Sequence, residues 1–253
     1  MIRISSLLIF LLAVHTPLCA AAEGGDLMHM EANLSNKASL RRGARTFVNY
    51  CLSCHSAEYM RFSRMGRDLG ISDNVLRKNF MFGTDKVGST MTVAMRSADA
   101  KQFFGVAPPD LSVIARARGG PDWLYTYLMS FYRDPSKSTG VNNLLFKDVS
   151  MPDVLWELQG WQRPVYKEVK DEAGKTVKRI DHLEMETPPG NKPKAYQGED
   201  FKQTVHDLVN FLVYVGEPIK LKRYTIGGWI MLYLALLLIV VYLMKREYWK
   251  DVH

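Results

Sequence analysis

The most apolar stretches of the chain lie near its two ends. At the amino end, Ser6 to Val14 is an apolar run behind one positive charge, Arg3, and the small side chains of Ala20 to Ala22 follow it. This tripartite pattern is typical of a secretory signal peptide and predicts removal of residues 1–22. The run is too short for a first membrane span, which needs about 20 apolar residues. Lipid attachment at Cys19 is a further alternative, although a bulky leucine precedes it.

The second apolar stretch runs from Tyr224 to Met244 and contains no charged side chain. At about 1.5 Å per residue, a helix over this stretch spans the hydrocarbon core of a bilayer. Tyr224, Trp229 and Tyr242 are placed like the aromatic side chains of membrane interfaces. A buried core helix explains the stretch less well, because it is long, free of charge and bordered by basic residues on both sides. We therefore predict a transmembrane helix over residues 224–244.

The charges that flank this segment do not decide its orientation. Three basic residues precede it and three follow it, so the positive-inside rule gives no answer. The signal peptide decides instead, because it sends the following chain across the membrane until the last span stops transfer. We expect residues 23–223 to form a periplasmic domain at a bacterial inner membrane, and residues 245–253 to form a cytoplasmic tail.

Between the two ends, the apolar positions mostly repeat with a helical period. Leu40, Ala44 and Phe47 recur at spacings near 3.6 residues, which predicts a helix over residues 37–51. Related patterns predict helices near residues 97–103, 110–117, 121–131 and 200–215. The expected fold class is therefore mainly α.

Two short segments alternate with a strand period instead. Val165 to Lys170 and Thr176 to Ile180 flank turn residues at 171–174, which predicts a β-hairpin. Long loops are expected near residues 66–92 and 160–197. Their apolar content favours surfaces for partners over disorder.

Composition and charge add limits to this picture. The chain has 253 residues, 47% of them hydrophobic, which suits one medium domain with a targeting segment and an anchor. The formal net charge is +7, but the basic residues are scattered among acidic ones. We therefore expect no nucleic-acid partner. Three cysteines are too few for a disulfide framework, and removal of the signal peptide would leave only Cys51 and Cys54.

The sequence Cys51-Leu52-Ser53-Cys54-His55 is the strongest chemical signal in the chain. Two cysteines three positions apart share one face of a helix, so both thiols can reach the two vinyl groups on one edge of a porphyrin. The imidazole of His55 then reaches under the ring to the iron. The motif predicts one haem c, bound covalently through two thioethers, with His55 as an iron ligand.

A zinc site, a redox pair and a plain disulfide each account for the motif less well. A zinc site needs four ligands, and the mature chain has no second pair of cysteines to complete one. A thioredoxin-like redox pair follows a strand and opens a helix, whereas this motif closes the helix predicted over residues 37–51. A disulfide between Cys51 and Cys54 leaves His55 unexplained.

The sixth iron ligand is less clearly marked. Methionine is a usual choice in electron-transfer cytochromes, although most methionines serve packing. Met151 stands apart, because Pro152 behind it favours an extended backbone that can cross the face of the ring. His182 and His206 are alternative ligands. The other methionines between the motif and the predicted span are Met60, Met65, Met81, Met91, Met95, Met129 and Met185.

Several blocks together resemble one family, cytochrome c1, the haem subunit of the cytochrome bc1 complex. Ala107 to Gly120 is similar to the family's block of P-P-D-L-S, R-A-R and G-G, which is more specific than the haem motif. Asp207 to Pro218 is similar to its D-x-x-x-F-L…E-P helix. A basic segment and one C-terminal span follow this helix, as they do in the family. The resemblance runs from about residue 40 to the end of the chain.

The resemblance implies a cytochrome c-like haem domain with long loop insertions, and it assigns further residues to the site. It implies that Met151 is the sixth ligand and that Arg118 lies near a haem propionate, where a guanidinium pairs well with a carboxylate. Residues 141–149 differ from the family's N-P-x-F-P-G-Q pattern, so the resemblance does not predict the geometry of the loop before Met151. The remaining residues implied to line the ring are Pro108, Pro109, Leu111, Ile114 and Trp123.

The resemblance also implies a function and partners. A chain of this kind has no catalytic residues of its own. It is the electron-transfer subunit of quinol–cytochrome c reductase, which takes an electron from the Rieske iron–sulfur subunit and passes it to another c-type cytochrome. Cytochrome b, the Rieske subunit and the lipid membrane are the implied partners, in a dimeric complex. The alternatives are a tethered c-type carrier or oxidase subunit outside such a complex, and a haem enzyme or sensor with an open sixth position.

Overall fold

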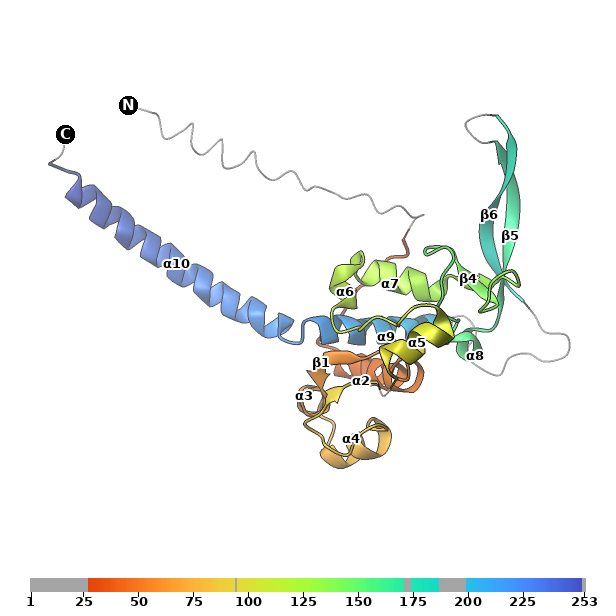
Figure 1. Ribbon diagram of the computed structural model, residues 1–253. Helices are drawn as coiled ribbons and strands as arrows, with labels where there is room; N and C mark the ends of the chain where they lie inside the picture. The colour runs from red at the N-terminus through yellow and green to blue at the C-terminus, as the bar shows by residue number, and fades with distance from the viewer. Residues whose placement is uncertain (1–26, 94, 171–173, 187–198, 252–253) are drawn as a thin grey trace.

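The computed structural model describes residues 27–93, 95–170, 174–186 and 199–251 of the chain (Figure 1). The predicted signal peptide lies outside these residues. The helices are α2 (Lys37–Thr46), the π-helix η1 (Phe47–Cys51), α3 (Phe62–Leu69), α4 (Asp73–Asn79), α5 (Ser97–Phe104), α6 (Ile114–Ala117), α7 (Gly120–Met129), α8 (Trp156–Gln159), α9 (Glu199–Gly216) and α10 (Lys220–Tyr248). The strands are β1 (Ala57–Arg61), β2 (Thr90–Met91), β3 (Phe131–Arg133), β4 (Val141–Asn143), β5 (Gln162–Lys170) and β6 (Thr176–Met185).

Helices α2 and α9 pack against each other and share the main hydrophobic core. The rings of Phe47 and Phe211 meet with centroids 5.6 Å apart. Gly43 permits the close approach of the two backbones, since a Cβ at this position would lie 1.9 Å from the carbonyl oxygen of Asp207. The buried carboxylate of Asp207 accepts hydrogen bonds from Arg42 Nε (2.5 Å) and Ser39 Oγ (2.6 Å). This contact fixes the end of α2, from which η1 continues into the cysteine motif.

The fold class is mainly α, as the sequence predicts, with three separate two-stranded antiparallel sheets among the described residues. The helix predicted over residues 110–117 is shorter, because Asp110 Oδ1 accepts the N–H of Ser112 in a turn and α6 begins only at Ile114. The loop predicted over residues 66–92 contains α4, whose seven residues give too short a pattern to recognise.

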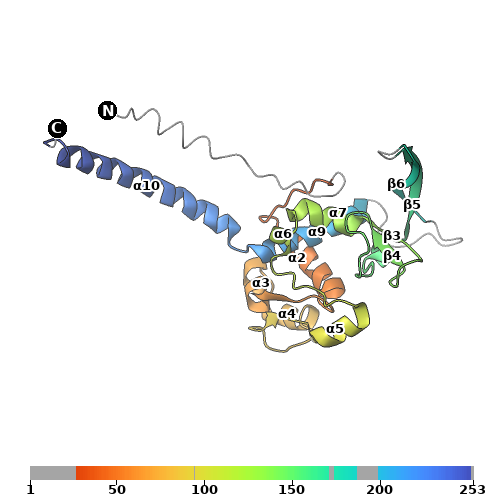
Figure 2. The same ribbon diagram turned by 45° about the horizontal axis from the view of Figure 1, so that its top comes forward.

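Strands β5 and β6 form a hairpin that projects from the helical body (Figure 1, Figure 2). It is longer than predicted, because pairing continues to Gln162 opposite Met185. The register shifts between Val165 and Tyr166, where Asp181 is an extra residue in the partner strand. Ion pairs cross the hairpin, among them Arg163 Nη2 with Glu184 Oε2 at 3.0 Å.

Helix α10 leaves the domain as a long straight rod (Figure 1, Figure 2). It contains the predicted span 224–244 and extends it by one turn at each end. The most apolar stretch of this helix has a mean hydropathy of 2.5, and none of the stretch is buried inside the molecule. In length and composition, α10 can therefore cross a bilayer. The side chains of α10 therefore contribute nothing to the core of the domain.

Candidate functional site

A cavity of about 390 Å³ opens beside helices α7 and α9. Its walls are mostly apolar with a few polar groups, which is typical of a site for an organic cofactor. The structure brings together here every site residue that the sequence predicted. These residues are Cys51, Cys54, His55, Pro108, Pro109, Leu111, Ile114, Arg118, Trp123 and Met151.

The cysteine motif begins at Cys51, which is the last residue of η1. The carbonyl oxygen of Cys51 accepts the N–H groups of Cys54 (3.0 Å) and His55 (2.8 Å), so the motif is wound into one tight turn. Both thiols are free rather than joined in a disulfide. Burial raises the pKa of the Cys51 thiol to about 12, with a smaller contribution from Cys54. The thiol is therefore protonated at neutral pH.

The imidazole of His55 is held by the Pro108–Pro109 segment. Its Nδ1–H donates to the carbonyl oxygen of Pro109 at 2.7 Å, which leaves Nε2 with a free lone pair for a metal. Burial lowers the pKa of His55, and the bond to Pro109 opposes this effect in part. The neutral imidazole that results is the form that binds iron.

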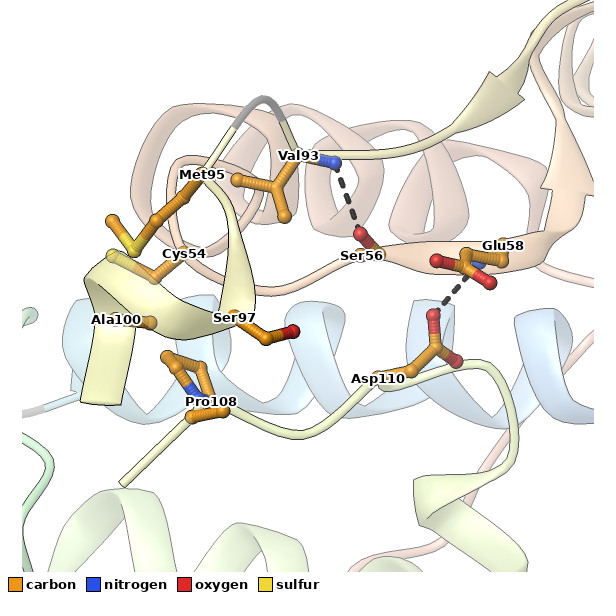
Figure 3. Close-up of a pocket in the computed structure, with 10 residues that line it drawn as sticks. Cys54, Ser56, Glu58, Val93, Met95, Ser97, Ala100, Pro108 and Asp110 are labelled. Atoms are coloured by element: carbon orange, nitrogen blue, oxygen red, sulfur yellow. Dashed lines mark hydrogen bonds between the residues drawn. The ribbon is translucent and has the colours of Figure 1, made fainter. Parts of the chain in front are cut away.

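The segment after Pro109 lies along the chain that follows the cysteine motif (Figure 3). Leu111 N–H donates to the carbonyl oxygen of Ser56 at 2.8 Å, and Glu58 N–H donates to Asp110 Oδ2 at 2.9 Å. These bonds place the Pro109 carbonyl beside His55. Ser112 Oγ also accepts the N–H of Tyr59 at 3.1 Å. The P-P-D-L-S block thus has a structural reason: the two prolines line the cavity, and Asp110 and Ser112 hold the segment against β1.

A smaller hollow of about 220 Å³ lies on the far side of Cys54 (Figure 3). Ser56 Oγ accepts the N–H of Val93 at its edge, at 2.9 Å. Cys54 and Pro108 line both this hollow and the main cavity. The hollow therefore adjoins the main cavity.

Met151 is the methionine on the cavity wall in the part of the chain that the structure describes. Its Sδ accepts a hydrogen bond from the hydroxyl of Tyr127 at 3.4 Å. Four of the other candidates are buried in the main core as packing side chains: Met60, Met65, Met81 and Met91. The geometry thus favours Met151 over the other methionines as the second protein ligand.

The two histidines considered as alternative ligands lie elsewhere. His182 is on β6, where its ring contacts Asp181 Oδ2 at 3.0 Å and Glu184 Oε1 at 3.4 Å. His206 is on α9, and its Nε2 donates to the carbonyl oxygen of Glu31 at 3.1 Å. Neither histidine lines the cavity.

Arg118 lies at the cavity between two aromatic rings. Its guanidinium carbon is 6.0 Å from the ring centroid of Trp123 and 5.5 Å from that of Phe146. Gly119 and Gly120 follow with φ of 69° and 82°, a left-handed turn that only glycine adopts readily. The double glycine after R-A-R therefore turns the chain into α7 and keeps Arg118 at the rim.

Sequence reasoning missed several side chains that complete the walls. The most informative is Tyr127, whose ring stacks on Trp123 (5.1 Å, 8°) and meets Phe131 edge-on (5.1 Å, 71°). Its position one helical turn after Trp123 was the available signal. Burial raises the pKa of the Tyr127 phenol, so it remains a hydrogen-bond donor across the physiological range. Others on the walls are Tyr50, Phe104, Leu124, Leu128, Phe146, Leu208 and Leu212.

The residues present fit a covalently bound haem. Two free thiols, an imidazole with Nδ1 already bonded, a thioether and a guanidinium surround one apolar cavity, and each matches a different part of that group. A zinc site fits poorly, because the described residues contain no group of three or more histidine, cysteine or acidic side chains. The donor set therefore matches what a c-type haem would require.

Comparison with known proteins finds one family model and several cytochromes c1 that are similar to this chain. Residues 30–252 match the model of the Cytochrome C1 family. A cytochrome c1 from Allochromatium vinosum is 46% identical over 96% of this chain and 97% of its own length. A cytochrome c1 from Rhodospirillum rubrum is 25% identical over 92% of this chain and 91% of its own.

One similar protein carries a different name. A protein of Nitrosomonas europaea called ammonia monooxygenase gamma subunit is 44% identical, over 94% of this chain and 94% of its own length. The likeness to this protein therefore extends over nearly the whole of both chains, as does the likeness to the cytochrome c1 of Allochromatium vinosum.

Proposed function

The chain belongs to the cytochrome c1 family, and from that premise we propose that it is the membrane-anchored, monohaem electron-transfer subunit of a bc1 complex. It receives an electron from the Rieske iron–sulfur subunit and passes it to a c-type cytochrome, beside cytochrome b in a dimeric complex. The observation that carries the proposal is the single cavity where the cysteine motif, the Pro-Pro-Asp-Leu-Ser block and Met151 converge.

Each site residue has a proposed role. Cys51 and Cys54 attach the haem through thioethers, and His55 and Met151 bind its iron. Arg118 pairs with a propionate, and Pro108, Pro109, Leu111, Ile114 and Trp123 line the ring. When bound, the haem supplies a one-electron ferric–ferrous couple. The chain itself excludes water from the apolar walls, fixes the tautomer of His55 and holds the donor hydroxyl of Tyr127 on the thioether.

The proposed placement follows from both ends of the chain. A cleaved signal peptide, residues 1–22, directs the domain of residues 23–223 to the periplasm of a bacterium. Residues 224–244 span the inner membrane and residues 245–253 form the cytoplasmic tail. The exposed apolar surface of α10 supports the anchor, because a helix of this composition is stable only in lipid or against other spans.

The sixth ligand is tested by optical spectra of the oxidised wild type and of Met151→Ala. We expect the weak charge-transfer band from methionine sulfur to iron in the wild type and its loss in the variant. We also expect the reduced variant to bind carbon monoxide, which the reduced wild type excludes. A band that survives in Met151→Ala would show that another residue is the ligand.

The complex is tested by purification through a tag on the C-terminal tail in mild detergent. We expect cytochrome b and the Rieske subunit to co-purify with the haem protein. If the chain co-purified with ammonia monooxygenase subunits instead, it would belong to the enzyme that the name of the Nitrosomonas relative indicates. Recovery of the haem protein alone would contradict membership of a bc1 complex.

A further inference from the structure

The loop that carries Met151 lacks the family pattern before it, and two buried asparagines occupy that region instead. We propose that Asn142 and Asn143, at the end of β4, are positioning residues that hold the thioether of Met151 at the cavity. Their side chains are among the most buried polar groups of the domain, at 3% and 1% exposed. The inference deepens the proposed function and rests on it, because it assumes that Met151 ligates the haem iron.

Asn142 holds the turn that precedes Met151. Its Oδ1 accepts the N–H of Asp148 at 2.9 Å and that of Asn143 at 2.9 Å. Asp148 has φ of 60°, the left-handed conformation, and among the described residues it is the one residue other than glycine that does so. An ion pair with Lys137 holds the carboxylate of Asp148. The backbone reversal three residues before Met151 is thus fixed from its N–H and from its side chain.

Asn143 bonds both to the start of the loop and to helix α7. Its Oδ1 accepts the N–H groups of Leu145 (2.9 Å) and Phe146 (3.1 Å), which folds the start of the loop around the amide. Its Nδ2 donates to the carbonyl oxygen of Tyr127 at 2.8 Å. Tyr127 in turn donates its hydroxyl to Met151 Sδ. One amide therefore connects the loop with the helix that contacts the sulfur.

An amide serves both purposes in a buried position. It accepts at one atom and donates at the other, and Asn142 also uses its donor, on Asp134 Oδ2 at 3.1 Å. An aspartate would accept but not donate, and a leucine of similar size would do neither. Loss of the acceptor would leave the backbone N–H groups of the loop without their partners, and the loop would open to satisfy them with water.

The test compares Asn142→Leu and Asn143→Leu with a matched variant, Asn210→Leu, in the full-length holoprotein. Asn210 is equally buried and its Nδ2 donates to Asn33 O and Ser39 Oγ at 3.0 Å each, but it lies in α9 away from the cavity. The readouts are the affinity of the reduced protein for carbon monoxide and the methionine–iron band of the oxidised protein. Carbon monoxide binds only where the thioether has left the iron, so its apparent affinity reports that fraction.

We expect the detached fraction, and with it the apparent carbon monoxide affinity, to rise roughly 10- to 100-fold in each loop variant. Asn210→Leu should keep the affinity and the band of the wild type. If one of the two loop variants fails to accumulate as holoprotein, the other still provides the test. If both loop variants match Asn210→Leu, the positioning role is overturned, while loss of the band in Met151→Ala would leave the proposed ligand intact. Survival of the band in Met151→Ala would overturn both.

Discussion

Single hydrogen bonds hold the two side chains that we assign to the iron. His55 donates from Nδ1 to Pro109, and Met151 accepts from Tyr127. With haem bound, both bonds would act on the electron density of a ligand: the first would make the imidazole a better donor to iron, and the second would draw charge from the sulfur. Residues that never touch the metal can therefore set its reduction potential.

Replacement of Tyr127 by phenylalanine tests this at the sulfur. The ring and its packing on Trp123 remain, and only the hydroxyl is lost. A donor on the thioether favours reduced iron, because less charge is pushed onto the ferric form. We expect the midpoint potential to fall by about 20 to 60 mV in a redox titration of the membrane-bound protein, a shift that corresponds to roughly the net free energy of one hydrogen bond.

Tyr214→Phe is the matched control for this change. Tyr214 is also a buried phenol, and it donates to Asp68 Oδ2 at 2.9 Å, but it does not line the cavity. Both variants lose one buried hydroxyl, so both lose some stability. An equal shift of potential in the two variants would mean that Tyr127 acts through the fold and not through the sulfur.

At the scale of elements, the cysteine motif depends on the contact between α2 and α9. These helices approach at Gly43, where no side chain separates the backbones. Asp207 joins them through Arg42 and Ser39. The two segments are far apart in the sequence, so the end of α2 is placed by a distant helix.

Gly43→Ala tests the contact. Alanine favours an isolated helix over glycine by about 1 kcal/mol, but its methyl group would overlap the backbone oxygen of Asp207. We expect the overlap to dominate and to lower the free energy of unfolding by about 2 kcal/mol. The melting temperature should fall by about 4 to 8 °C in a thermal scan. Gly88→Ala is the control, since nothing lies within 4 Å of a Cβ there; equal melting of the two variants would contradict the contact.

The elements differ in how far the sequence predicts them. The helix before Cys51, helix α9 and the hairpin follow from periodicity and turn residues. The ten residues predicted for the site meet in one cavity. The loop from Leu144 to Met151, which follows β4, does not follow from the sequence, because side-chain amides of Asn142 and Asn143 replace regular backbone pairing there. Such bonds leave no repeating pattern, and neither does the contact of Tyr127 with the sulfur.

At the scale of the whole molecule, the haem domain and α10 are separate in their packing. The helix contributes no side chain to the core, and its apolar window is unburied. The domain buries its own apolar side chains around α2 and α9. Its stability should therefore not depend on the anchor.

A chain that ends at Pro218 tests this independence. We expect it to attach haem, to show the optical spectrum of the full-length protein and to move to the soluble periplasmic fraction. Fractionation followed by haem staining measures the change, with the full-length chain in the membrane pellet as reference. Haem protein that stays in the pellet after a high-salt wash would reveal a second attachment to the membrane.

Three residues, 217–219, join α9 to α10, and they are stiffened by Pro218 and by the ion pair of Glu217 Oε1 with Arg223 Nη1 at 2.9 Å. So short a linker allows the haem domain almost no movement relative to α10. A redox centre at a fixed height above the lipid cannot travel between a donor and an acceptor. Any electron exchange then requires that the donor and the acceptor come to this domain in turn.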